Sequence, residues 1–355
     1  MATATKVRDS NIELFRILLM LMIIAHHYVN HGITADQYDY SHLTGNQIFL
    51  LLWGWGGKTG VNCFLLITGY FMCQQSFTWK KFLKLYLEIK FYCLLIPVVF
   101  WAIGKQPLSF SYCFETLFGV AMNVGSDFPP TFLAMLLLVP FINRLIKVMD
   151  STSHLRLLVI LLLIYTITGT MFFNSIPDHI GWYVTVYLMG AYLRLYTPSI
   201  IGDVKKSLLL VVVSLSLCFG SIVFFAFTKN SLGFTVYYLV SDSNQILAVL
   251  ATLALFAFFK SINLGHNRWI NLISTATFGV FLIHDQANMR EWLWKDMFCA
   301  QDYFTSDRLW LHALCTLAII YVSCVIIDIA RQRLIEKPLF TWLDKRYPIL
   351  GSPVI

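Results

Sequence analysis

Long apolar stretches, separated by short polar segments, make up most of this chain. A helix needs about 20 mostly apolar residues to cross a bilayer, and we searched for runs of that kind. The pattern predicts an all-α fold, a polytopic bundle of about ten transmembrane helices in an integral membrane protein. The predicted spans cover residues 12–30, 46–73, 82–103, 129–148, 155–173, 180–196, 207–227, 238–259, 271–289 and 309–330.

Composition supports a membrane protein and argues against a nucleic-acid partner. Hydrophobic residues make up 58% of the chain and charged residues only 13%, whereas a soluble domain has about 25% charged residues. The net charge of +7 is explained by lysines and arginines in cytoplasmic loops. No repeat, linker or appended soluble segment stands out, so we expect a single transmembrane domain over residues 1–355.

The distribution of positive charge predicts the orientation. With ten spans, 18 of the 26 Lys and Arg residues fall on the side that holds the N-terminus and 5 fall on the other side. Cytoplasmic loops carry the excess of positive charge. We therefore expect a multi-pass protein of the cell membrane with both termini in the cytoplasm.

The first predicted span carries titratable side chains at regular positions. Arg16 and His27 are separated by ten residues, which places them on one helix face about 16 Å apart, whereas His26 points about 100° away from His27. Glu13 lies one turn before Arg16, close enough to pair with it. Charged groups inside a membrane usually face a cavity and serve function. The alternative is that Arg16 only anchors the helix end in the headgroups and His27 is interfacial.

Two further segments predict a polar cavity near the outer half of the membrane. Residues 53–62 are rich in Gly and Trp and contain Lys58 and Asn62. Glycine serves close helix packing as readily as a broken helix beside a cavity, and both interpretations stay open. His284 and Asp285 lie deep in the ninth span, on the same predicted side as His27. We expect these four residues to line an acceptor cavity, although a buried histidine such as His284 is often only a packing residue.

The first predicted cytoplasmic loop contains Lys80, Lys81 and Lys84. Such a cluster of point charges suits phosphate groups. The alternative is an ordinary positive-inside loop.

A metal site is not expected. His27 and His31 are four residues apart, a spacing compatible with a metal, but no third ligand follows at a fixed spacing. We therefore predict no metal and no bound cofactor.

Five motifs occur in order along nearly the whole chain: Glu13-x-x-Arg16 with His27 after ten further residues, Gly60-Val61-Asn62-Cys63-Phe64-Leu65-Leu66-Ile67-Thr68-Gly69-Tyr70, Lys80-Lys81-x-x-Lys84, Phe281-Leu282-Ile283-His284 and Glu336-Lys337-Pro338-Leu339. Their content and order resemble the acyltransferase-3 family of membrane acyltransferases. Lysines replace the usual arginines of the family's basic motif, Thr68 replaces a serine, and Glu13 replaces the commoner aspartate. Lysine cannot form the bidentate phosphate contact of arginine.

The resemblance implies O-acylation, usually O-acetylation, of a cell-surface or exported carbohydrate, with acetyl-CoA as the donor substrate. His27 would be the general base, because an acceptor hydroxyl must lose a proton to attack a thioester and imidazole has a suitable pKa. Arg16 would meet the donor, held by Glu13, and the three lysines would bind the phosphates of coenzyme A. Direct transfer and transfer through an acyl-enzyme both remain open.

The alternative function is a membrane transporter or flippase for a sugar or a lipid-linked substrate, because histidine, arginine and glutamate inside a membrane also form proton relays. No pair of half-chain repeats supports that alternative. The expected partners are acyl-CoA, a carbohydrate acceptor and the lipid bilayer, without nucleic acid. A homo-oligomer is left open.

Overall fold

The computed structural model describes residues 9–119, 124, 127–172 and 179–353. Lys6, Arg8 and the last residue of the predicted span 155–173 lie outside these residues. Within the described ranges the chain folds into helices joined by turns, and the only strand-like pairing is an isolated bridge between Thr78 and Pro353. The predicted all-α class is confirmed.

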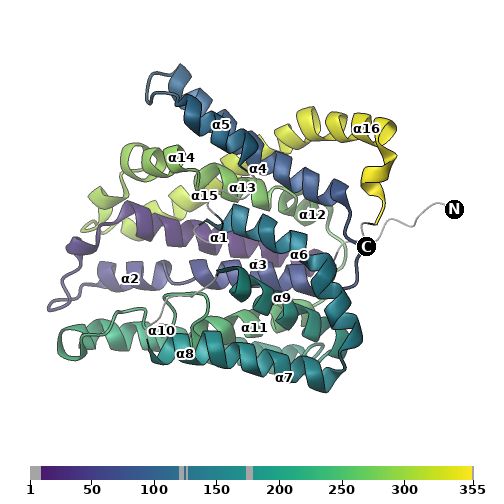
Figure 1. Cartoon of the computed structure of the whole chain (residues 1–355). Coiled ribbons are helices and arrows are strands. Elements are labelled where there is room, and N and C mark those ends of the chain that lie inside the picture. The colour runs from purple at the N-terminus through teal and green to yellow at the C-terminus, as the bar shows by residue number, and fades with distance from the viewer. Residues whose placement is uncertain (1–8, 120–123, 125–126, 173–178, 354–355) are drawn as a thin grey trace.

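The helices follow one another as a bundle whose long members run side by side (Figure 1). Among the described residues, six helices are long and apolar enough to cross a membrane, starting with α1 and ending with the helical stretch Leu309–Arg346. The chain is therefore a multi-pass membrane protein. The α-helices are α1 (Ser10–Gly32), α2 (Gly45–Trp53), α3 (Gly57–Met72), α4 (Trp79–Ala102), α5 (Phe110–Phe118), α6 (Phe128–Val148), α7 (Ser151–Leu162), α8 (Thr168–Met171), α9 (His179–Tyr196), α10 (Val204–Leu232), α11 (Ile246–Ser261), α12 (Arg268–Ser274), α13 (Thr277–His284), α14 (Ala287–Glu291), α15 (Leu309–Arg331) and α16 (Lys337–Arg346).

Three predicted spans are not continuous helices. Span 46–73 breaks between α2 and α3 at residues 54–56, which include Gly54 and Gly56. Span 238–259 begins as turns and becomes helical only at Ile246, and span 271–289 is divided among α12, α13 and α14. Hydropathy reports which residues are apolar, but it does not report where backbone hydrogen bonding is interrupted. The number of membrane crossings therefore stays a prediction.

Helix α1 lies in the middle of the bundle (Figure 1) and contributes to two apolar clusters. Phe15 and Leu19 pack with residues of α3, α9 and α11, whereas Ile24 and Tyr28 pack with residues of α4, α13 and α15. The two clusters hold α1 from different sides.

Glycines allow α3 to pack closely against α9 and α1. A Cβ atom at Gly69 would collide with the Tyr187 carbonyl of α9, and one at Gly190 would collide with the Leu66 carbonyl of α3. At the other end of α3, a Cβ at Gly57 would collide with the His26 ring of α1. Small residues allow this close approach of backbones in membrane helices. Close packing, one of the two interpretations of the glycine-rich segment, is therefore observed.

Candidate functional site

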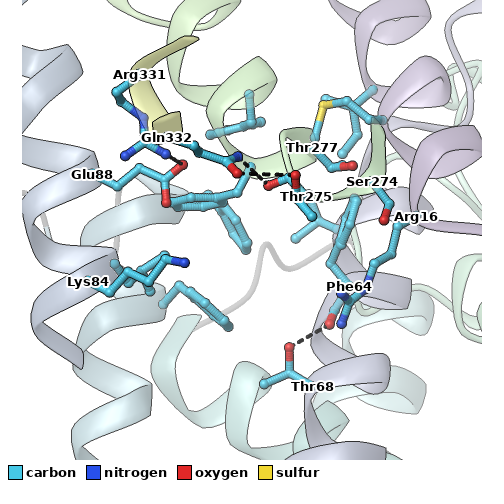
Figure 2. A pocket seen from close by; sticks show the side chains of 18 of the residues that line it. Arg16, Phe64, Thr68, Lys84, Glu88, Ser274, Thr275, Thr277, Arg331 and Gln332 are labelled. Atoms are coloured by element: carbon cyan, nitrogen blue, oxygen red, sulfur yellow. Dashed lines mark hydrogen bonds and ion pairs between the residues drawn. The ribbon is translucent and has the colours of Figure 1, made fainter. Parts of the chain in front are cut away.

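Two cavities lie along α1. The termini-side cavity has a volume of about 300 Å³ and reaches α1 near Arg16, at the end where α1 begins and α15 ends (Figure 2). The far-side cavity has a volume of about 530 Å³ and reaches α1 at His27 and His31. Arg16 and His27 thus face different cavities on one helix, about 16 Å apart along its axis.

Four apolar side chains line both cavities: Ile23, Val61, Phe128 and Phe281. They come from α1, α3, α6 and α13. Because the same residues face both spaces, they form the wall that separates them. A group that passes from Arg16 to His27 must pass these four side chains.

Arg16 is paired as the i, i+3 spacing predicted. Its Nη1 atom lies 3.5 Å from Oε2 of Glu13, and the hydroxyl of Ser274 in α12 donates to the same oxygen at 2.6 Å. Glu13 is buried, whereas the side chain of Arg16 is 32% exposed. Glu13 therefore anchors Arg16 from behind and leaves its guanidinium at the cavity surface.

A second arginine of the termini-side cavity lies in a buried cluster of carboxylates. Arg331 forms ion pairs with Asp328 at 2.7 Å and with Glu88 and Glu336 at 2.9 Å each. Asp328 is fully buried and also accepts a hydrogen bond from Tyr92 at 2.8 Å. Figure 2 shows Arg331, Glu88 and Lys84 on one side of the cavity and Arg16 on the opposite side. The cluster joins α4 to the end of α15.

The three lysines expected to act together lie in a helix rather than a loop, and only Lys84 is among the described lining residues of the termini-side cavity. They belong to the first turns of α4, because Thr78 caps this helix by accepting from the Lys81 amide. Lys84 lines the termini-side cavity and pairs with Glu336 at 2.7 Å. Lys80 instead pairs with Asp344 of α16 at 2.6 Å, and neither Lys80 nor Lys81 is among the described lining residues. The spacing places Lys80 and Lys84 on one helix face, a turn apart, but their ammonium groups pair with different acidic residues, Asp344 and Glu336.

His27 is held from behind by residues of α13. Its Nδ1 atom lies 3.0 Å from Nε2 of His284 and 3.4 Å from Oδ1 of Asp285. His284 is fully buried, and its Nδ1 atom lies 2.6 Å from the Val280 carbonyl oxygen. The structure brings His27, His284 and Asp285 together, although 257 positions separate the two histidines.

Two of the four residues predicted to line an acceptor cavity are among the described lining residues of the far-side cavity. Lys58 and Asp285 line the far-side cavity, whereas Asn62 and His284 are not among its described lining residues. Asn62 is buried, donates to the Ser243 carbonyl at 2.6 Å and accepts from the Trp182 indole at 3.0 Å. Its polar atoms are committed to joining α3 to α9 and to the segment before α11. His284 lies behind His27 rather than beside the cavity.

Helical geometry turns His26 about 100° away from His27, yet both histidines line the far-side cavity. The Nδ1 atom of His26 lies 2.6 Å from the carbonyl oxygen of Gly54. A carbonyl only accepts, so His26 donates this hydrogen bond. It therefore holds the C-terminal end of α2, where α2 and α3 separate.

The far-side cavity also brings together a set of groups able to hold a metal ion. Ligand atoms of His27, His31 and Asp285 all lie within 4.8 Å of one another. Asp285 is the third ligand that the spacing of the histidines did not supply. The same carboxylate pairs with Arg290 at 3.0 Å, which partly neutralises it. The expectation of no metal stays a prediction.

Sequence reasoning missed Arg331 and Arg290 as site residues. Asp328 and Arg331 have the same i, i+3 spacing as Glu13 and Arg16, at the end of the last apolar run. That spacing was the available signal, and Arg16 and Arg331 both line the termini-side cavity. Arg290 has no comparable local signal, because its pairing with Asp285 depends on the turn between α13 and α14.

Comparison with known proteins gives one result that covers most of the chain. A family model described as an acyltransferase domain matches residues 9–328. This range contains α1, with the three histidines of its far end that line a cavity, and α13. No curated protein and no solved structure matches the chain.

Proposed function

Because the chain belongs to the acyltransferase-3 family of membrane acyltransferases, we propose that it moves an acetyl group from acetyl-CoA to a hydroxyl of a cell-surface or exported carbohydrate. One observation carries the proposal. Helix α1 presents Arg16 to one cavity and His27 to another, and the two cavities share a wall. A donor bound by its charge on one side and a hydroxyl activated on the other would meet along this helix.

His27 acts as the general base of the proposed reaction. The acceptor oxygen attacks the thioester carbonyl and its proton passes to His27. A carbon–oxygen bond forms, the carbon–sulfur bond breaks, and the coenzyme A thiolate leaves and takes up the proton. The protein returns to its starting state, and the products are an ester and free coenzyme A.

The termini-side cavity is proposed as the donor site. Coenzyme A is a polyanion, and Arg16 and Lys84 line this cavity from opposite sides (Figure 2). Coenzyme A is also cytosolic, so this assignment agrees with both termini in the cytoplasm and a place in the cell membrane. Lys80 and Lys81 lie on the exposed first turn of α4 and would act only through the general field of the surface.

The far-side cavity is proposed as the acceptor site. Its polar lining includes Lys58, Asp285 and Arg290 beside His27. Side chains of both charges suit a hydroxyl-rich molecule, which needs donors and acceptors of hydrogen bonds. This cavity lies at the end of α1 away from the described termini.

The decisive experiment measures release of free thiol from acetyl-CoA by the purified protein in detergent, with and without a polysaccharide acceptor. We expect slow release alone and faster release with the acceptor, accompanied by an added acetyl mass on the polysaccharide. His27→Ala should abolish both, whereas His42→Ala, at an exposed position, should not. Uptake of a sugar into vesicles without any thiol release would instead support the transporter.

Orientation is tested by labelling introduced cysteines from outside the cell. Lys295 and Lys205 are both exposed and lie at opposite ends of the bundle in the predicted topology. A membrane-impermeant thiol reagent should label Lys295→Cys but not Lys205→Cys. Labelling of Lys205→Cys would overturn the cytoplasmic assignment.

A further inference from the structure

We infer that His284 is a positioning residue that fixes the tautomer of His27, a role that rests on the proposed function of His27 as a base. His284 ends α13 and is fully buried. It is not among the described lining residues of the far-side cavity, so the acceptor would not touch it. His284 instead contacts His27, through which it can act on the reaction.

The contacts of His284 determine which of its nitrogens carries hydrogen. Nδ1 lies 2.6 Å from the Val280 carbonyl oxygen. That oxygen only accepts hydrogen bonds, so Nδ1 is the protonated nitrogen. In a neutral imidazole the other nitrogen, Nε2, then carries a lone pair and can only accept. A doubly protonated ring would place a charge in the interior, and the adjacent Asp285 carboxylate is already paired with Arg290 at 3.0 Å.

The contacts of His27 likewise determine which of its ring nitrogens carries hydrogen. Its Nδ1 atom lies 3.0 Å from the accepting Nε2 of His284, so Nδ1 of His27 must donate. The carboxylate oxygen of Asp285, 3.4 Å from the same atom, also accepts. Both neighbours therefore require hydrogen on Nδ1. The lone pair of His27 is left on Nε2, which is the nitrogen free to take a proton from the acceptor.

The other charged and titratable groups around His27 do not disturb this arrangement. His26 donates from Nδ1 to the Gly54 carbonyl. His31 approaches Asp285 at 3.9 Å, and Arg290 contacts Asp285. The hydrogen-bonded chain therefore runs from the Val280 carbonyl through His284 to His27. It fixes the base as a buried aspartate does in a serine–histidine–aspartate triad, but a neutral ring takes the place of the acid.

The test compares three substitutions at one position. The amide of glutamine reaches the place of Nε2 and keeps an acceptor for His27, whereas the shorter asparagine reaches only the place of Nδ1. We expect His284→Asn and His284→Ala to lower kcat about 100-fold with KM for acetyl-CoA within about 2-fold. His284→Gln should stay within about 10-fold of the wild type. Equal kcat in all three variants and the wild type would overturn the role.

A second measurement uses the wild-type protein and needs no stable His284 variant. Nitrogen-15 spectra of histidine-labelled protein in membranes report which ring nitrogen carries hydrogen. The signal that is present in the wild type and missing in His27→Ala belongs to His27. We expect it to be that of a neutral ring with hydrogen on Nδ1 and none on Nε2. Loss of a ring with hydrogen on Nε2 would overturn the inference. An inactive wild-type protein, or an active His27→Ala, would instead refute the proposed function itself.

Discussion

The two cavities differ in what surrounds their charged groups. On the termini side, Arg331 is enclosed by three carboxylates and is 6% exposed, so its charge is committed to holding helices together. On the far side, His27 has one nitrogen held by α13 and a side chain that lines open space. The comparison teaches that one helix can present differently held charged groups to two cavities, for which we propose binding at one end and proton transfer at the other. The predictions below test that division.

The largest effect on the reaction is expected from His27→Ala. Loss of a general base typically lowers the rate by a factor of about 10² to 10⁴. Expression and donor affinity should stay close to normal, because the substitution does not touch the termini-side cavity. The measurement is acetyl transfer at equal membrane abundance.

His26→Ala is the matched control for this experiment. It removes a ring at the same depth and from the same cavity, together with the hydrogen bond to Gly54. We expect most activity to remain, with some loss of stability where α2 meets α3. An inactive His26→Ala beside an active His27→Ala would reverse the assignment.

Arg331→Ala is expected to affect stability more than any other change on the termini side. It leaves Glu88, Asp328 and Glu336 without their shared counter-ion, and breaking a buried ion pair costs about 3–5 kcal/mol. The measurement is the thermal midpoint of the purified protein in detergent. An Arg331→Ala protein as stable as wild type, with weakened donor binding, would make this arginine a ligand rather than a structural group.

Val61→Phe is expected to obstruct the passage between the two cavities without altering either charged site. Val61 belongs to the shared wall, and a larger ring there would obstruct passage between Arg16 and His27. Because a misplacement of about 1 Å can cost a factor of about 100 in rate, we expect a comparable fall in kcat with little change in donor affinity. Val61→Ala serves as the control. Full activity in Val61→Phe would show that the acetyl group follows another route.

Arg16→Gln is expected to weaken donor binding by about 10-fold, because a hydrogen bond to a charged group contributes about 1.5–3 kcal/mol. Arg16→Lys keeps the charge but not the forked geometry, and it should restore part of the affinity. Titration of acetyl-CoA against each variant measures this. Unchanged affinity in both variants would remove Arg16 from the donor site.

The smallest effect is expected from the lysines of α4. Lys84→Gln should raise KM for acetyl-CoA by a few fold, up to about 5-fold, because this half-exposed side chain is screened by solvent. The double variant Lys80→Gln/Lys81→Gln should have less effect than Lys84→Gln alone, since neither residue lines the cavity. A larger effect of the double variant would restore the original prediction of a phosphate-binding cluster.

Local spacing within one helix was sufficient to predict several features of this protein. The length of the apolar runs indicated a membrane bundle, and the Glu13–Arg16 pair follows from an i, i+3 spacing that any α-helix converts into contact. The placement of Arg16 and His27 on cavity-lining surfaces of α1 follows from helical periodicity as well. These features depend only on residues a few turns apart.

Tertiary structure alone decided which residues distant in the sequence contact the site residues and line the cavities. His284 was assigned to the acceptor cavity, yet the packing of α13 against α1 places it behind His27. Asn62 was assigned there too, yet the close approach of α3 and α9 at Gly69 and Gly190 goes with a buried, fully hydrogen-bonded Asn62. Such contacts join residues more than a hundred positions apart, and no helical period relates them. The physical reason is that helix geometry sets the face of a side chain, whereas only packing sets what that face meets.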